Sequence, residues 1–282
     1  KLSDGRYGLF YYYGTTPEGW PIEDVASIQK SVTSILTGVA VRRKLVDINR
    51  SVTSYTGAGW SKASRAQEAA ITVRHLLAMA SGLDEQLVYQ APAGRRWFYN
   101  TTAYGKMDDV LEAATGQKLP ELTNAWLTAP LSMTDSRWET RLDGLTVGSN
   151  NIGFVTTPRD LARFGMLILN GGMWDGRDVI ADPQWLKASF SQSQPENAAY
   201  GYLWWLNNGA YSYGLAGNER RQEPLIPTAP KDLVAGVGHF TRRLYVVPSQ
   251  SLVVVRLGPE ADVKTFDREV WIRIRAAAPA KS

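Results

Sequence analysis

The sequence predicts an α+β fold, in which an antiparallel sheet built from both ends of the chain is flanked by helices and holds a mostly helical inserted lobe. Strand-like runs lie near the N-terminus and in the last third of the chain, whereas helical patterns dominate the middle. The 282 residues are 44% hydrophobic and 21% charged, values typical of a folded globular protein with an ample core. We therefore expect a sheet lobe formed by residues 1–30 and 180–282, a helical lobe formed by residues 31–179, and an active site between them.

The first half of the chain combines one strand with several helices. Residues 6–14 form an aromatic-rich run that predicts a strand. A long helix is expected from Ser27 onward, because apolar residues recur at helical spacing between Val32 and Val39. Residues 47–60 are loop-like. Further helices are predicted at 73–80, 102–115 and 158–169, the second closed by Gly116 and the third opened by Thr157 as N-cap.

A short helix begins at Pro183, and the pattern then changes to strands. Strand-like runs cover residues 200–207, 233–238, 243–247 and 252–257. Only the segment Pro-Ser-Gln-Ser separates the last two runs, which predicts an antiparallel hairpin. The final helix is expected at 263–276, with Phe266, Val270 and Ile274 on one face.

Composition excludes several classes of function. The chain has no cysteine, so disulfide scaffolds, thiolate metal sites and cysteine nucleophiles are ruled out. Its only histidines are His75 and His239, and no metal-binding spacing includes them, so we expect an enzyme without metal or cofactor. The net charge of +4 is spread over scattered arginine pairs without interleaved aromatic residues, which argues against nucleic-acid binding. No apolar run is long enough to predict a membrane span.

Two properties stay open at this level. The oligomeric state does not follow from the sequence. The compartment is periplasmic or secreted if a signal peptide has been removed, and cytoplasmic otherwise.

Ser27 and Lys30 are the residues most indicative of chemistry. A spacing of three on a helix brings the amine of the lysine close to the serine hydroxyl. A serine needs a base to become a nucleophile, and a lysine becomes a base when burial lowers its pKa. The alternative interpretation is a solvated serine and lysine on a helix face, since this spacing also arises by chance. The proline-marked entry before Ser27 and the apolar helix after it favour a buried nucleophile pair.

Several segments, in order along almost the whole chain, resemble the serine β-lactamase-like hydrolases. This group includes class C β-lactamases, family VIII carboxylesterases, penicillin-binding DD-peptidases and 6-aminohexanoate-dimer hydrolases. The segments that carry the resemblance are 27–36, 75–83, 94–101, 157–165, 245–249 and 252–256. The resemblance implies a β-lactamase/transpeptidase-like fold and a small ester or amide as substrate.

The resemblance also implies roles for individual residues. Ser27 corresponds to the acylated nucleophile, Lys30 to its partner base, and Tyr99 to a phenolic acid/base. We expect the pKa of Tyr99 to fall, because the ammonium of Lys30 would stabilise a phenolate. The alternative for Tyr99 is an ordinary aromatic residue at a helix entry. His75 is expected to be structural, and a Ser–His–Asp triad that uses it would leave Lys30 without a role.

The chain departs from the family pattern at two motifs. Thr101 stands where the family often has an asparagine, which puts amide-dependent substrate orientation in doubt. In the third motif, 238–241, His239 takes the charged position and Thr241 replaces a close-approach glycine, so we expect a narrowed groove. The resemblance implies oxyanion donors at the backbone amides of Ser27 and of a residue near Arg242.

These features favour a metal-free serine hydrolase of the esterase or amidase type. A guanidinium of Arg242 or Arg243 is a candidate contact for a substrate carboxylate. The altered motifs leave two alternatives open: a binding or sensor protein that has lost turnover, and a true β-lactamase or DD-peptidase. A carbohydrate-binding module would need an aromatic platform, and alternating Tyr11-Tyr12-Tyr13 provides none by itself.

Overall fold

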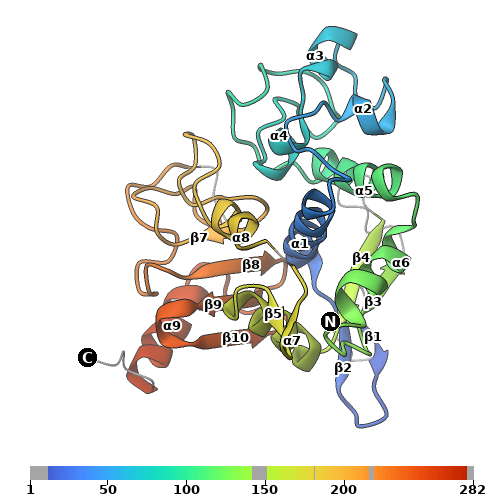
Figure 1. The fold of residues 1–282 in the computed structure, drawn as a ribbon. Helices are drawn as coiled ribbons and strands as arrows, with labels where there is room; N and C mark the ends of the chain where they lie inside the picture. Colours follow the sequence, from blue (N-terminus) through green and yellow to red (C-terminus); the bar gives the residue numbers. More distant parts are fainter. Residues whose placement is uncertain (1–11, 142–150, 181, 216–218, 278–282) are drawn as a thin grey trace, which may run out of the picture.

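The computed structural model describes residues 12–141, 151–180, 182–215 and 219–277. These residues form an α+β fold with antiparallel sheets and several helices, which confirms the predicted fold class (Figure 1). No helix in the part of the chain described here is both long and apolar enough to cross a lipid bilayer.

The C-terminal sheet has the strand order β10-β9-β8-β7, and every neighbouring pair is antiparallel. The strands are β7 (Trp205–Leu206), β8 (Val234–Gly238), β9 (Arg242–Val247) and β10 (Leu252–Arg256). The predicted hairpin is present, with Val254 opposite Tyr245 and a short 3₁₀ turn between the strands. The predicted strand at 200–207 is wrong for its first half. There the Gly201 amide donates to the Trp204 carbonyl at 2.9 Å, so the chain turns back and only β7 is extended.

A second four-stranded sheet, in the order β1-β2-β4-β3, lies apart from the first. Its strands are β1 (Tyr12–Thr15), β2 (Pro21–Asp24), β3 (Arg137–Thr140) and β4 (Ile152–Thr156). The expectation of a single sheet shared by both termini therefore needs correction within the described residues, because β1 pairs with β2 and not with the C-terminal strands. The rest of the predicted N-terminal strand, residues 6–11, lies outside the described residues.

The long helices agree with the sequence patterns. They are α1 (Gln29–Arg42), α5 (Thr101–Thr115), α7 (Pro158–Leu169) and α9 (Phe266–Ala277), and the short helix expected from Pro183 is α8 (Pro183–Ser189). The Thr157 hydroxyl caps α7 by accepting from the Asp160 amide at 3.2 Å, and Gly116 closes α5 in the left-handed conformation, as predicted. Shorter helices are α2 (Thr53–Thr56), α3 (Arg65–Ala69), α4 (Val73–Leu77) and α6 (Leu119–Thr123), and β5 (Met173–Trp174) pairs with β6 (Arg177–Asp178).

Helix α1 is the centre of the molecule. Residues 29–40 are all buried, so the helix has no solvent-facing side along most of its length. It packs against α5 on one side and against β8 and α8 on the other (Figure 1). A 3₁₀ turn, Ala26–Ile28, precedes it and contacts β8 and β9. The first turn of α1 therefore lies where the C-terminal sheet meets the helical part of the chain.

Helix α7 packs against β9 and β10, although its sequence falls in the predicted helical lobe. Gly165 permits this packing, because a Cβ there would lie 2.5 Å from a Val253 methyl group. The division into lobes stays a prediction, and we propose that its second boundary falls before Pro158 rather than at residue 180.

Candidate active site

Ser27 lies in the 3₁₀ turn directly before α1, in a backbone that the neighbouring side chains hold in place. Ala26 has a φ of 51°, a left-handed conformation that costs an L-residue energy. Its amide donates to Asp24 Oδ1 at 2.7 Å, and Asp24 Oδ2 accepts from Arg141 Nε at 2.7 Å. Asp24 is fully buried, so this ion pair fixes the turn from inside the protein. No motif in the sequence pointed to Asp24 or Arg141.

Lys30 is buried beside Ser27. Its ammonium nitrogen lies 3.1 Å from Ser27 Oγ, and only 2% of the residue is exposed. Burial, with a smaller contribution from the Arg141 guanidinium, lowers the pKa of Lys30 to about 7, while Asp108 and Asp24 oppose the shift. A neutral amine is therefore available near neutral pH to accept the serine proton.

Tyr99 reaches Ser27 from the segment before α5. Tyr99 and Ser27 line the same cavity, and Lys30 Nζ lies 5.0 Å from the centre of the Tyr99 ring. The ring stacks on Trp205 at 5.8 Å. The expectation of a lowered pKa is wrong, because burial raises the pKa of Tyr99 to about 12, although Ser27 opposes the shift. Tyr99 is a neutral phenol near neutral pH.

Ser27 and Tyr99 open into a cavity of about 350 Å³. Its wall includes Trp205, Gly238 and the exposed side chain of His239. Within the described residues, no group of three histidine, aspartate or glutamate side chains is arranged to hold a metal ion. The cavity thus brings together Ser27, Tyr99 and His239 from segments far apart in the sequence.

Gly238 provides the close backbone approach that the sequence analysis assigned to position 241. A Cβ at Gly238 would lie 2.4 Å from the carbonyl oxygen of Val25, two residues before Ser27. A glycine inside a strand is a sequence signal for such an approach, and Gly236-Val237-Gly238 carries it.

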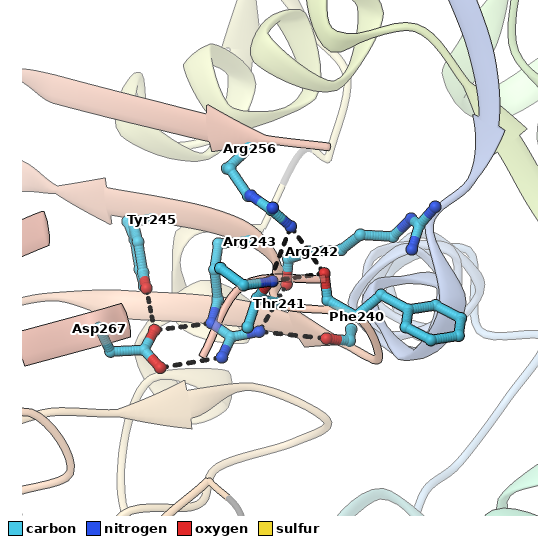
Figure 2. Close-up of polar contacts among 9 residues, drawn as sticks. Phe240, Thr241, Arg242, Arg243, Tyr245, Arg256 and Asp267 are labelled. Atoms are coloured by element: carbon cyan, nitrogen blue, oxygen red, sulfur yellow. Dashed lines mark hydrogen bonds and ion pairs between the residues drawn. The ribbon is translucent and has the colours of Figure 1, made fainter. Parts of the chain in front are cut away.

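The turn between β8 and β9 has a strained backbone. Phe240 and Thr241 have φ values of 56° and 55°, and the Arg242 amide donates to the His239 carbonyl at 3.3 Å. This is the geometry of a type I′ turn, which normally needs glycine or asparagine. Arg256 holds it: Nη1 donates to the Phe240 carbonyl at 2.6 Å and to the Thr241 hydroxyl at 2.7 Å (Figure 2).

The Thr241 hydroxyl forms hydrogen bonds that hold the β8–β9 turn. It donates to the Phe240 carbonyl at 2.6 Å and accepts from the Ala261 amide at 2.9 Å. Thr241 is buried, and the residue lines the cavity. Its hydroxyl therefore stabilises the turn. The prediction from the sequence concerned a different effect, a narrowing of the substrate groove by the Thr241 side chain.

Both arginines after the turn are engaged in buried ion pairs. Arg242 Nη2 donates to Glu23 Oε2 at 2.7 Å. Arg243 binds Asp267 through two hydrogen bonds of 2.7 and 2.8 Å, and the Tyr245 hydroxyl also donates to Asp267 (Figure 2). Arg243 is among the cavity-lining residues, but its charge is balanced by Asp267. Neither guanidinium is poised to hold a substrate carboxylate.

Thr101 is the first residue of α5 and is not among the residues that line the cavity. The preceding Asn100 caps the helix: its side-chain oxygen accepts from the Ala103 amide at 2.9 Å, and its amide donates to the Leu83 carbonyl at 3.0 Å. His75 is structural, as expected, because Nδ1 accepts from the Thr72 amide at 3.0 Å. Thr101 and Arg242 thus stand apart from the cavity that contains Ser27.

Comparison with known proteins assigns the chain to a family. The family model described as Beta-lactamase matches residues 23–278. The chain belongs to the beta-lactamase family. The matched range covers Ser27, Lys30 and Tyr99 together with the whole C-terminal sheet.

Individual known proteins are similar to the chain in sequence or in fold. The 6-aminohexanoate-dimer hydrolase of Paenarthrobacter ureafaciens is 27% identical over 169 residues, which is 55% of this chain and only 37% of that protein's length. A Bacteroides dorei protein assigned as a beta-lactamase superposes with a TM-score of 0.72 at 17% identity, over 95% of this chain and 87% of that one. A beta-lactamase/D-alanine carboxypeptidase of Yersinia pestis gives 0.65 at 18% identity, over 93% and 84%. These two likenesses concern the fold.

Proposed function

We propose that the protein is a serine hydrolase that cleaves a small ester or amide through an acyl-enzyme on Ser27. The single observation that carries the proposal is the buried Lys30 amine at 3.1 Å from Ser27 Oγ, with a pKa lowered to about 7 by burial. A neutral amine at hydrogen-bond distance is what a serine needs in order to attack a carbonyl carbon.

The proposed reaction has two halves. Lys30 accepts the Ser27 proton as Oγ attacks the substrate carbonyl, and the Tyr99 hydroxyl then protonates the leaving group while the Lys30 ammonium restores the Tyr99 proton. Water subsequently attacks the acyl carbon while Lys30 accepts a proton from it; the bond from this carbon to Ser27 Oγ then breaks, and the Lys30 ammonium returns the proton to Oγ, which releases the acid and regenerates Ser27 and the neutral amine. Tyr99 suits the donor role, because burial keeps it a neutral phenol.

The oxyanion would be stabilised by backbone amides next to Ser27. The amide of Arg242 donates to the His239 carbonyl at 3.3 Å, so it is already used within the turn. We therefore propose the amide of Ser27 and the backbone at the end of β8, around Gly238 and His239. β7 pairs only with Val234 and Ala235, and in the described residues no strand borders the rest of that edge of β8. A substrate backbone could align there.

An ester or a linear amide is favoured over a β-lactam. The Arg242 and Arg243 charges are balanced by Glu23 and Asp267. Neither guanidinium is therefore available as the cation that would bind a substrate carboxylate. The Paenarthrobacter relative is named for hydrolysis of a linear amide dimer, which supports the amidase alternative.

The test is covalent labelling combined with a substrate panel. Wild type should react with a fluorophosphonate at Ser27, as located by mass spectrometry, and Ser27→Ala should not react. Wild type should also turn over p-nitrophenyl esters or a linear amide faster than nitrocefin. Labelling without turnover of any substrate would favour a binding or sensor protein on the same fold, and failure of wild type to label would refute the nucleophile itself.

A further inference from the structure

A carboxyl group with one buried oxygen, that of Asp108, lies on the face of α5 that contacts Lys30. Helix α5 runs along α1, and the Tyr104 ring of α5 lies 4.7 Å from Lys30 Nζ. The Tyr104 hydroxyl shares a hydrogen bond of 2.8 Å with Thr33. Asp108 follows Tyr104 by four residues, so it lies on the same face of α5, one turn further along.

The Asp108 carboxyl group is not fully satisfied by hydrogen bonds. Its Oδ1 is buried and makes no hydrogen bond. An unsatisfied buried carboxyl oxygen is costly, so its presence calls for a reason. Asp108 also lines a cavity of about 590 Å³ between α5, α6 and the start of β4, separate from the cavity at Ser27.

The other charges around this second cavity have partners. Lys106 pairs with Asp109 at 2.9 Å, and Lys118 pairs with Glu112 at 2.8 Å. From α1, the cation that acts on Asp108 is Lys30. The Arg141 guanidinium, which also acts on Lys30, is paired with Asp24. Asp108 is thus positioned as the carboxyl counterpart of Lys30.

The electrostatics of the two groups are consistent with this pairing. Burial, followed by the charges of Asp109 and Glu112, raises the pKa of Asp108 to about 7, and Lys30 opposes the shift. Burial lowers the pKa of Lys30 to about 7 as well, and Asp108 opposes that shift. Two interacting groups with similar pKa values titrate as a pair that shares a proton.

We propose that Asp108 is a positioning residue for catalysis: its carboxylate stabilises the ammonium that forms on Lys30 when Ser27 is deprotonated, and it sets the pH range in which Lys30 can act. In this step the Ser27 O–H bond breaks and a Lys30 N–H bond forms, while the Asp108 carboxylate stabilises the new positive charge electrostatically. The inference rests on the proposed serine hydrolase function and adds a fourth residue to it.

The test compares Asp108→Asn with the control variant Asp178→Asn. For wild type, kcat/KM for a p-nitrophenyl ester should rise with pH through about 7, because below that pH Lys30 is protonated and cannot accept the Ser27 proton. Asp108→Asn removes a charge that holds the Lys30 pKa up, so the rise should move to lower pH by roughly one unit. Asp178 is exposed on β6 and is not among the charges that act on Lys30 or Asp108, so Asp178→Asn should leave the profile in place.

Two further measurements keep the outcome decisive. Asp108→Ser repeats the test with a smaller neutral side chain if the asparagine variant does not fold. The rate of fluorophosphonate labelling against pH reads the deprotonation of Ser27 without turnover. A wild-type profile in either Asp108 variant, or a shift to higher pH, overturns the role of Asp108 while the serine hydrolase stands. Absence of labelling in wild type overturns the proposed function instead.

Discussion

Burial gives Lys30 and Tyr99 different roles in proton transfer. Burial disfavours the charged form of each group, so it lowers the pKa of the lysine to about 7 and raises that of the tyrosine to about 12. The amine is therefore the base and the phenol the proton donor. This assignment reverses the phenolate expected from the sequence, where only the attraction between opposite charges was considered.

Variants of these two residues should behave differently. Lys30→Ala should lower the rate of Ser27 labelling and all turnover by roughly 10²–10⁴-fold, because no base remains. Tyr99→Phe should lose much less on a p-nitrophenyl ester, whose leaving group needs no proton, than on a linear amide, whose nitrogen must be protonated. The measurement is kcat for both substrates, with the melting temperature as control for folding. Equal losses of Tyr99→Phe on both substrates would contradict the donor role.

At the scale of elements, the β8–β9 turn is the part of the site held under strain. Two successive L-residues, Phe240 and Thr241, adopt left-handed conformations, and Arg256 from β10 binds both (Figure 2). Backbone strain of this kind persists only where the surroundings enforce it. The guanidinium of Arg256 thus fixes the wall of the cavity opposite Ser27.

Replacement of this guanidinium should affect both stability and rate. Arg256→Gln should lower the free energy of unfolding by about 2 kcal/mol, because it removes hydrogen bonds from a charged donor. It should also lower kcat roughly 10-fold or more, because the turn that borders the nucleophile shifts. Arg137→Gln is the matched control, since Arg137 forms an exposed ion pair on β3 and should change stability by less than about 0.5 kcal/mol. Denaturant unfolding and steady-state kinetics measure both effects, and an unchanged kcat in Arg256→Gln would show that the turn does not position the site.

At the scale of the whole molecule, the site depends on how closely the C-terminal sheet approaches the start of α1. Gly238 lies against the backbone of Val25, and Gly236 lies against Ile28, where a Cβ would be 3.0 Å from a methyl carbon. This contact joins the helix that carries Ser27 and Lys30 to the strand that borders the cavity. The nucleophile is therefore placed by packing between segments more than 200 residues apart.

Two glycine-to-alanine variants should have opposite effects. Gly238→Ala should destabilise the protein by about 1–3 kcal/mol and reduce turnover, because its Cβ would be 2.4 Å from the Val25 carbonyl oxygen. Gly105→Ala should stabilise it by roughly 0.5–1 kcal/mol, because Gly105 is inside α5 and a Cβ there meets nothing within 4 Å. Thermal unfolding of the pair checks the prediction. A neutral Gly238→Ala would mean that the sheet does not constrain the nucleophile.

Features that depend on local chain properties could be predicted from the order of residues alone. The extents of α1, α5 and α7 and the β9–β10 hairpin follow from periodicity, capping residues and a short turn, so they could be predicted to within a few residues. The placement of Lys30 beside Ser27 was predictable for the same reason, because a spacing of three on a helix fixes that distance.

Properties that depend on contacts between distant segments became visible only in the folded chain. The pairing of β2 with β4 joins residues about 130 positions apart, and the partners of Arg242 and Arg243 come from β2 and α9. The raised pKa of Tyr99 and the buried Asp108 oxygen without a hydrogen bond likewise result from packing among residues from several elements. A linear pattern records which groups are near along the chain, whereas solvent exclusion and charge pairing are set by everything that packs around them.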